Sequence, residues 1–260
     1  MWNTLKATLW QTRRNVFLRV GLFYVLASML LIIVEDFSPN ATGSLLAGDA
    51  AQMLCVWLPM LVGWNTAAIC GTDLGDKTAN YELLFGKKRS DVYFGRFFAA
   101  LIVNFVIVTL LTLLLPVVGM IANGWGGSLP AKTALMHFAS IYPVIFRLVC
   151  VYTAITFLCM NMVVPLAISF IGTMLVMLSS VLIAETGTDV KLTWQTASSD
   201  CMRLLDLNNK TTGFFEGQDI TVYKSALTGS IILESLTASL VIGTVCLLLS
   251  YAVFRRRDVM

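Results

Sequence analysis

Charged residues are scarce in this chain. Only 13% of its 260 residues are Asp, Glu, Lys or Arg, and 57% are hydrophobic, whereas a soluble domain averages about 25% charged and about 45–50% apolar residues. So little charge leaves too little polar surface to keep the chain in water, which excludes a soluble enzyme, a disordered chain and an ordinary secreted domain. The net charge of +3 is too small to indicate a nucleic-acid partner. The composition therefore predicts an integral membrane protein.

Residues that carry chemistry are scarce as well. His137 is the only histidine, and the six cysteines show neither a CxxC pair nor Cys/His ligand spacing, so we expect no metal site. Cys201 is the only cysteine clearly outside the apolar runs, which implies no disulfide framework. No phosphate-binding loop is present, because Gly86-Lys87-Lys88 lacks the upstream glycine and the hydroxyl residue of that motif. We expect no catalytic residue and no cofactor in this chain.

Uncharged runs set the number of membrane crossings, because a helix needs about 20 apolar residues to cross the hydrocarbon. The long uncharged segment 133–184 is interrupted only by Arg147, so it predicts two helices with a tight turn near Asn161 and Met162. No sustained alternation of the kind that a membrane barrel needs is present, which favours an all-α fold. The six predicted transmembrane helices are 16–36, 50–70, 94–121, 134–160, 163–184 and 229–254.

The basic residues predict the orientation of these helices. Lys and Arg concentrate in the segments 1–19, 77–96 and 255–257, and short loops rich in Lys and Arg stay in the cytoplasm. Both termini are therefore predicted to be cytoplasmic.

The chain is interpreted as one transmembrane domain, 1–260, with three segments outside the spans. Segment 1–15 has apolar and basic residues at helical spacing, which predicts an interfacial helix; a frayed basic leader is the alternative. Segment 185–228 is predicted to be an extracellular loop. Its aromatic and leucine residues make it too apolar for disorder, so we expect short helices against or within the outer membrane face. Segment 71–93 is the cytoplasmic loop between the second and third helices.

The cytoplasmic loop is the most informative segment. Charged residues concentrate in 71–96, whereas the runs on either side carry almost none. A short helix is predicted to begin near Asp76 or Thr78 and to end at Gly86, because glycine favours helix ends. Without further information, the alternative is a solvated loop whose basic residues only keep it on the cytoplasmic side of the membrane.

The loop and the topology together resemble the membrane subunit of type-2 ABC exporters. In that family an interfacial helix precedes the first span, and a coupling helix lies between spans two and three. The ending 254–259 also resembles the exit from the last span of these proteins. Within the family, Thr78-Ala-Asn-Tyr-Glu-Leu-Leu-Phe-Gly-Lys-Lys-Arg89 looks most like the bacitracin-resistance and lantibiotic-immunity permeases of Gram-positive bacteria. The matching loop positions are Gly75, Thr78, Leu83, Leu84, Gly86 and Arg89.

The resemblance implies a permease subunit in a bacterial plasma membrane that exports an amphipathic or antimicrobial peptide. It implies a dimer with a second copy or a paralogue. It also implies cytoplasmic ATPase subunits, which would bind ATP and Mg in place of this chain. Leu83, Leu84 and Phe85 would fill a cleft on the ATPase, and Glu82, Lys87 and Arg89 would pair at its rim. The expected coupling residues are Asp76, Thr78, Asn80, Tyr81, Glu82, Leu83, Leu84, Phe85, Gly86 and Arg89.

Among the ionisable residues of the predicted spans, we single out Arg147, Glu234 and His137. Charges in such positions are costly and usually face protein or water. Arg147 could line a substrate path or pair with Glu234 across a dimer, or it could form a structural pair or reach carbonyl groups beside Pro143. The alternative function is a self-sufficient secondary transporter or channel that uses these three residues without an ATPase. A scaffold or sensor subunit is a third possibility.

Overall fold

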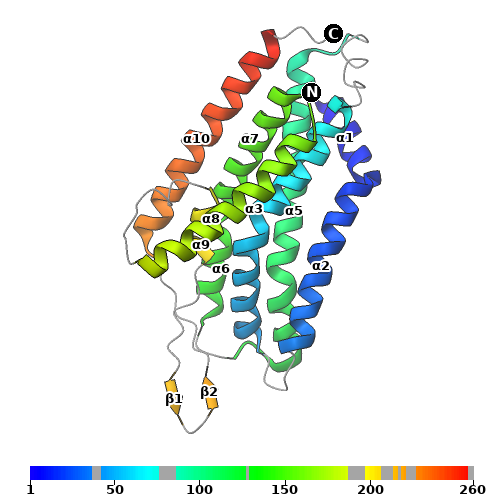
Figure 1. Cartoon of the computed structure of the whole chain (residues 1–260). Coiled ribbons are helices and arrows are strands. Elements are labelled where there is room, and N and C mark those ends of the chain that lie inside the picture. The colour runs from blue at the N-terminus through cyan, green and yellow to red at the C-terminus, as the bar shows by residue number, and fades with distance from the viewer. Residues whose placement is uncertain are drawn as a thin grey trace.

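The described chain is almost entirely α-helical (Figure 1). The computed structural model describes residues 1–36, 42–75, 86–126, 129–186, 197–205, 213–215, 218–220 and 227–256. The helices are α1 (Trp2–Arg14), α2 (Val16–Asp36), α3 (Gly43–Gly75), α5 (Arg89–Asn123), α6 (Ala131–Ser140), α7 (Tyr142–Cys159), α8 (Val163–Thr186), α9 (Ala197–Leu205) and α10 (Gly229–Arg256).

A small antiparallel hairpin is the one sheet in the described residues. Its strands are β1 (Gly213–Phe215) and β2 (Gln218–Ile220), and Phe214 lies opposite Asp219. The sequence predicted only helices in this loop. Strands of three residues are too short to give an alternating pattern that could be recognised.

The long helices form an elongated bundle with two distinct ends. Figure 1 places α1 and the last residues of α10 at one end, which we call the terminal end, and the β1–β2 hairpin beyond the other, which we call the hairpin end. Both described ends of the chain therefore lie at the same end of the bundle.

Three helical units are long and apolar enough to cross a membrane: α5, the α6–α7 unit from Ala131 to Cys159, and α10. The two halves of α3 make a fourth if they are counted as one bent span. The described apolar stretches of α2 and α8 are the shorter segments Val16–Ala27 and Val163–Leu175. Helices thus lie in all six predicted regions, while the structure supports three or four crossings by length and composition.

Helix α3 is the centre of the bundle. It packs against α2, α5, α7, α8 and α9, and Leu46, Leu54 and Leu58 are fully buried along it. Its halves Gly43–Cys55 and Trp57–Thr72 meet at 56°. Pro59 explains this bend, because a proline has no N–H to offer the carbonyl four residues earlier, here Cys55, and its ring clashes with it.

A buried polar network joins α3 to α5. Asn65 Nδ2 donates to Asn104 Oδ1 at 3.0 Å, and Asn104 Nδ2 donates to Thr66 Oγ1 at 3.2 Å and to the Ala100 carbonyl at 2.9 Å. All three side chains are fully buried. Hydrogen bonds between side chains hold helices together where surrounding lipid supplies no hydrophobic driving force.

The predicted fourth helix is divided into α6 and α7. The break lies at Ile141, two residues before Pro143, because that proline cannot donate the hydrogen bond that would continue α6 into α7. The turn between α7 and α8 lies where the sequence places it. Met160 has a left-handed backbone with φ of 52°, and Asn161 Oδ1 accepts the backbone N–H of Val163 at 2.8 Å, which caps α8.

Small residues let α10 pack closely on α7. The buried stripe of α10 includes Ser235, Ser239 and Gly243, the small-residue spacing that brings membrane helices together. A Cβ added at Gly243 would lie 3.1 Å from a ring carbon of Phe146 and 3.3 Å from Arg147 Cα. The glycine is therefore needed for the close approach.

Helix α1 lies across the terminal end and packs against α5. Its buried face is formed by Thr4, Leu5, Thr8 and Thr12, and a Cβ at Gly95 would lie 3.0 Å from Thr4 Cβ. The sequence predicts an interfacial helix here, and the structure buries its apolar residue Leu5 against protein. The exposed large hydrophobic side chains of this helix are Trp2 and Trp10.

We predict that Asn104→Ala lowers the free energy of unfolding by about 1–2 kcal/mol, because it removes both interhelical hydrogen bonds of this side chain and leaves Asn65 without its acceptor. Thermal unfolding of the purified protein in detergent measures the effect. The matched control on α5 is Leu110→Ala, since Leu110 is 64% exposed on the bundle surface. Equal destabilisation by the two variants would contradict a stabilising role for the network.

Candidate functional site

Helix α9 is docked into the side of the bundle. It comes from the predicted extracellular loop, which the sequence expects to contain short helices, and it packs against α3, α7 and α10. Figure 1 shows it beside α6, in the half of the bundle nearer the hairpin end. Asp200, Cys201, Leu204 and Leu205 form its buried face. Cys55 Sγ, beside the bend of α3, lies 3.8 Å from the Cys201 carbonyl and donates to it.

A buried ion pair holds α9 to α7. Arg147 Nη2 lies 2.5 Å from Asp200 Oδ2, and the two side chains are 2% and 5% exposed. A charged group is not stable in such surroundings without a partner of opposite charge. The pair therefore favours the docked position of α9, which supplies a carboxylate to a guanidinium that has almost no exposed surface.

The other two predicted intramembrane residues also contact α9. His137 Nδ1 lies 2.6 Å from the Leu204 carbonyl; since a carbonyl only accepts, this nitrogen carries the proton and donates it. Glu234 Oε2 lies 3.9 Å from Arg203 Nη1 in a solvent-exposed pair. Arg147, His137 and Glu234 thus contact one nine-residue helix at three separate points.

Sequence reasoning missed Asp200, the residue that completes this site. Arg147 was considered as a partner for Glu234 across a dimer or as part of a structural pair, and within this chain it pairs with Asp200. The basic residue stands out because it interrupts a long apolar run. The acidic residue lies in a polar loop among several others, so its sequence carries no comparable signal.

Not all the donor atoms of Arg147 are used in the ion pair with Asp200. Among the described residues, Arg147 Nε and Nη1 and the hydroxyl groups of Ser235 and Ser239 are buried without a hydrogen-bond partner. The two serines lie on the α10 stripe that faces α7. Unsatisfied buried donors are rare in folded proteins, so this part of the α7–α10 contact has unused hydrogen-bonding capacity.

At the terminal end, the start of α5 is attached to the end of α10. Arg89 Nη1 donates to the carbonyls of Phe254 at 3.2 Å and Arg255 at 3.0 Å. These are among the last carbonyls of α10, which lack helical partners and attract a positive charge. Gly86, which precedes this contact, has φ of 82°, a backbone conformation that favours glycine. The helix that was predicted to end there lies outside the described residues.

Tyr93 strengthens the same attachment. Its hydroxyl donates to the Leu247 carbonyl at 3.1 Å and is hydrogen-bonded to Ser250 Oγ. Its ring centroid lies 4.6 Å from that of Phe157 on α7 and 5.9 Å from that of Phe254 on α10. We call this set of contacts, made by Arg89 and Tyr93, the terminal anchor.

Most of the expected coupling residues lie outside the described residues. Asp76, Thr78, Asn80, Tyr81, Glu82, Leu83, Leu84 and Phe85 belong to this group. Gly86 and Arg89 are described, and Arg89 was expected to pair at the rim of an ATPase. In the chain itself it contacts α10.

The described residues contain no group of three His, Cys, Asp or Glu side chains placed to hold a metal ion. Comparison of the chain with protein-family models and with curated proteins gave no match.

We predict that Asp200→Ala releases α9, because removing one partner leaves Arg147 as an uncompensated buried charge. The cost of about 3–5 kcal/mol corresponds to an increase of about a hundredfold or more in the exposed population. The readout is the labelling rate of Cys201, which is fully buried in the docked state, with a water-soluble maleimide and peptide mapping. Glu234→Gln is the matched control, since it removes only the exposed pair with Arg203. Unchanged labelling in Asp200→Ala would contradict the docking role of the ion pair.

Burial raises the pKa of the Asp200 carboxyl above its ordinary value of 3.8, and the positive charge of Arg147 beside it opposes the rise. Burying this carboxyl is therefore costly, and its pairing with Arg147 offsets the cost.

Proposed function

We propose that this chain is the membrane subunit of an ATP-driven exporter in a bacterial plasma membrane. It crosses the membrane six times with the terminal end in the cytoplasm, it dimerises with a second copy or a paralogue, and cytoplasmic ATPase subunits bind the segment 76–89. An amphipathic peptide is the cargo, and the resemblance of Thr78–Arg89 to peptide-resistance permeases is the reason for this choice.

The terminal anchor is the observation that carries the proposal. A loop that only completes the topology has no need of a fixed attachment to another helix. Here Arg89 and Tyr93, which lie in the last part of the predicted loop and at the start of α5, are hydrogen-bonded to α10. A force applied at 76–85 would therefore move α5 and α10 together instead of being lost in a flexible joint.

Helix α10 supports transmission toward the other end. It packs along α7 through its small residues, and its first turns carry Glu234, which contacts Arg203 of α9. Movement of α10 against α7 would disturb the helices that hold α9, and with them the Arg147–Asp200 pair. In this mechanism α9 is a gate at the hairpin end, and ATP hydrolysis by the partner acts on it through α10.

The ATPase attachment is tested with an affinity-tagged chain purified from its host membranes. Wild type should copurify with a subunit that carries a phosphate-binding loop and hydrolyses ATP. Leu83→Asp should lower the affinity for that subunit about thirtyfold or more, as expected for the loss of a buried apolar anchor. Arg256→Glu is the control, because Arg256 is an exposed basic residue at the same end of the bundle. Retention of the ATPase by Leu83→Asp would overturn the proposed attachment.

Tyr93→Phe distinguishes attachment of the ATPase from transmission of its movement. Since the Tyr93 hydroxyl is hydrogen-bonded to α10 and Tyr93 lies outside the proposed ATPase-binding segment, this variant should keep the ATPase bound while ATP-dependent transport in liposomes falls more than ATP hydrolysis does. Transport by the purified wild-type chain alone without ATP would favour the self-sufficient transporter instead.

A further inference from the structure

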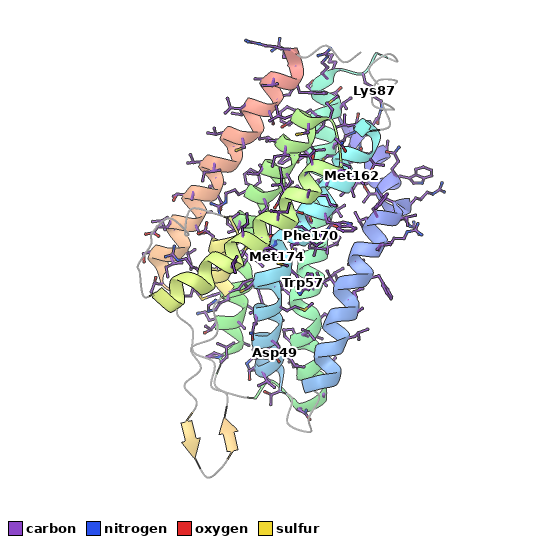
Figure 2. All side chains as sticks on the ribbon, viewed as in Figure 1. Asp49, Trp57, Lys87, Met162, Phe170 and Met174 are labelled. Atoms are coloured by element: carbon purple, nitrogen blue, oxygen red, sulfur yellow. The ribbon has the colours of Figure 1, made fainter. Side chains whose placement is uncertain are left out.

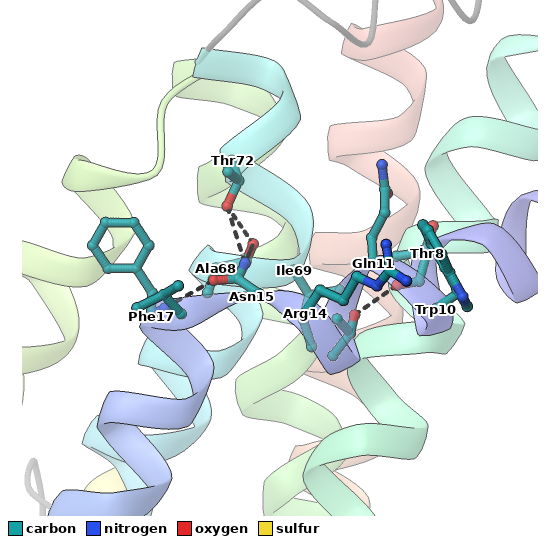
Figure 3. A pocket seen from close by; sticks show the side chains of 11 residues that line it. Thr8, Trp10, Gln11, Arg14, Asn15, Phe17, Ala68, Ile69 and Thr72 are labelled. Carbon is teal, nitrogen blue, oxygen red and sulfur yellow. Dashed lines mark hydrogen bonds between the residues drawn. The ribbon is translucent and has the colours of Figure 1, made fainter.

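The joint between α1 and α2 is fixed by one residue. Asn15 is the extended residue between the two helices. Its Oδ1 accepts the Phe17 N–H at 2.9 Å and caps α2, and its Nδ2 donates to the Ala68 carbonyl at 3.3 Å and to Thr72 Oγ1 at 3.5 Å. These hydrogen bonds attach the joint between α1 and α2 to α3. Figure 3 shows the residues that line the pocket beside this joint.

This space is a cleft of about 330 Å³ with a cationic side. Its lining includes Thr8, Gln11, Arg14 and Thr72. The Arg14 guanidinium carbon lies 3.9 Å from the centroid of the Trp10 ring, so stacking positions the charge, as Figure 3 shows. Arg19 donates to the Arg13 carbonyl at 3.3 and 3.0 Å, which adds a second guanidinium at the joint.

No acidic residue offsets these charges in the same part of the sequence. Residues 1–34 contain Lys6, Arg13, Arg14 and Arg19 but neither Asp nor Glu. The joint therefore attracts anions, and Trp2 and Trp10, both exposed on α1, belong to the residue type that is enriched at membrane–water interfaces.

An apolar groove lies next to the cleft, one helical turn further along α2 and α3. Its volume is about 400 Å³, and its lining includes Gly21, Trp57, Trp64, Phe170 and Met174. Trp57, Phe170 and Met174 lie close together in Figure 2.

The indole of Trp64 connects the groove with the cleft. Its Nε1 donates to the carbonyl of Phe17, a cleft residue, at 2.9 Å. A Cβ added at Gly21 would lie 3.0 Å from that same nitrogen. The glycine therefore lets the ring of this groove residue lie against α2 and reach the backbone of the cleft residue Phe17.

We propose that the cleft and the groove together form a binding site for a phospholipid with an anionic headgroup. The headgroup phosphate would lie at Arg14, and an acyl chain would lie along Trp57 and Trp64. A free anion would leave the groove empty, and an uncharged apolar ligand would leave Arg14 unmatched, so the neighbouring pair of sites fits a ligand with both parts. Basic clusters at the membrane surface attract such lipids. This site does not depend on the transport function proposed above.

The charge side of the site is tested by native mass spectrometry of the purified protein. The probes are dioleoyl phosphatidylglycerol and dioleoyl phosphatidylcholine, which share acyl chains and differ in net charge. Arg14→Gln should weaken phosphatidylglycerol binding about fivefold, the effect of one basic residue near a membrane surface, and weaken phosphatidylcholine binding less, because choline offsets the charge of the phosphate in that headgroup. The matched control, Arg256→Gln, should change neither by more than about twofold. If the two variants lost phosphatidylglycerol binding equally, the lipid would be attracted by the overall positive charge, and the proposed site would be wrong.

The role of the apolar groove is tested with substitutions that leave all charged residues unchanged. Met174→Trp, which fills the groove from an exposed position on α8, should weaken both lipids. Leu178→Trp, one turn further on and similarly exposed, should weaken neither. Unchanged binding in Met174→Trp would overturn the role of the groove. Displacement of phosphatidylglycerol by soluble glycerol phosphate would overturn the lipid assignment, because it would indicate a site for the free headgroup alone.

Discussion

A charged side chain within a membrane helix must find its partner inside the protein, and the Arg147–Asp200 pair is where this constraint shapes the molecule. Arg147 is nearly inaccessible, so its charge depends on a carboxylate from another segment. That carboxylate lies on α9, 53 residues away in sequence. The need to neutralise one arginine therefore draws part of a long loop into the bundle.

The two ends of the bundle are linked by the helices that meet there. At the terminal end, α10 accepts the hydrogen bonds of Arg89 and Tyr93, and in the other half it contacts α9 through Glu234. Between these points, serines and a glycine keep α10 against α7. A close contact of this kind has few alternative arrangements, because packed interfaces deform in discrete steps and not continuously.

Much of the fold could be predicted from the sequence because apolar length and turn residues are local signals. The uncharged runs located the long helices, and Asn161 with Met162 located the turn before α8. The break at Ile141 follows from Pro143, which lies inside the segment 134–160 that was predicted as one helix. The candidate site was found only in part, since Arg147 interrupts a run and Asp200 does not.

The sequence by itself determined that the chain is a helical membrane-type protein, where its long helices lie, and which segments are basic, because each of these depends on residues close together along the chain. Only the tertiary structure decided that Asp200 neutralises Arg147, that threonines form the buried face of α1, and that Arg89 binds the end of α10. These choices depend on which surfaces meet when the helices pack, and pairing between distant segments leaves no periodic trace in a single sequence.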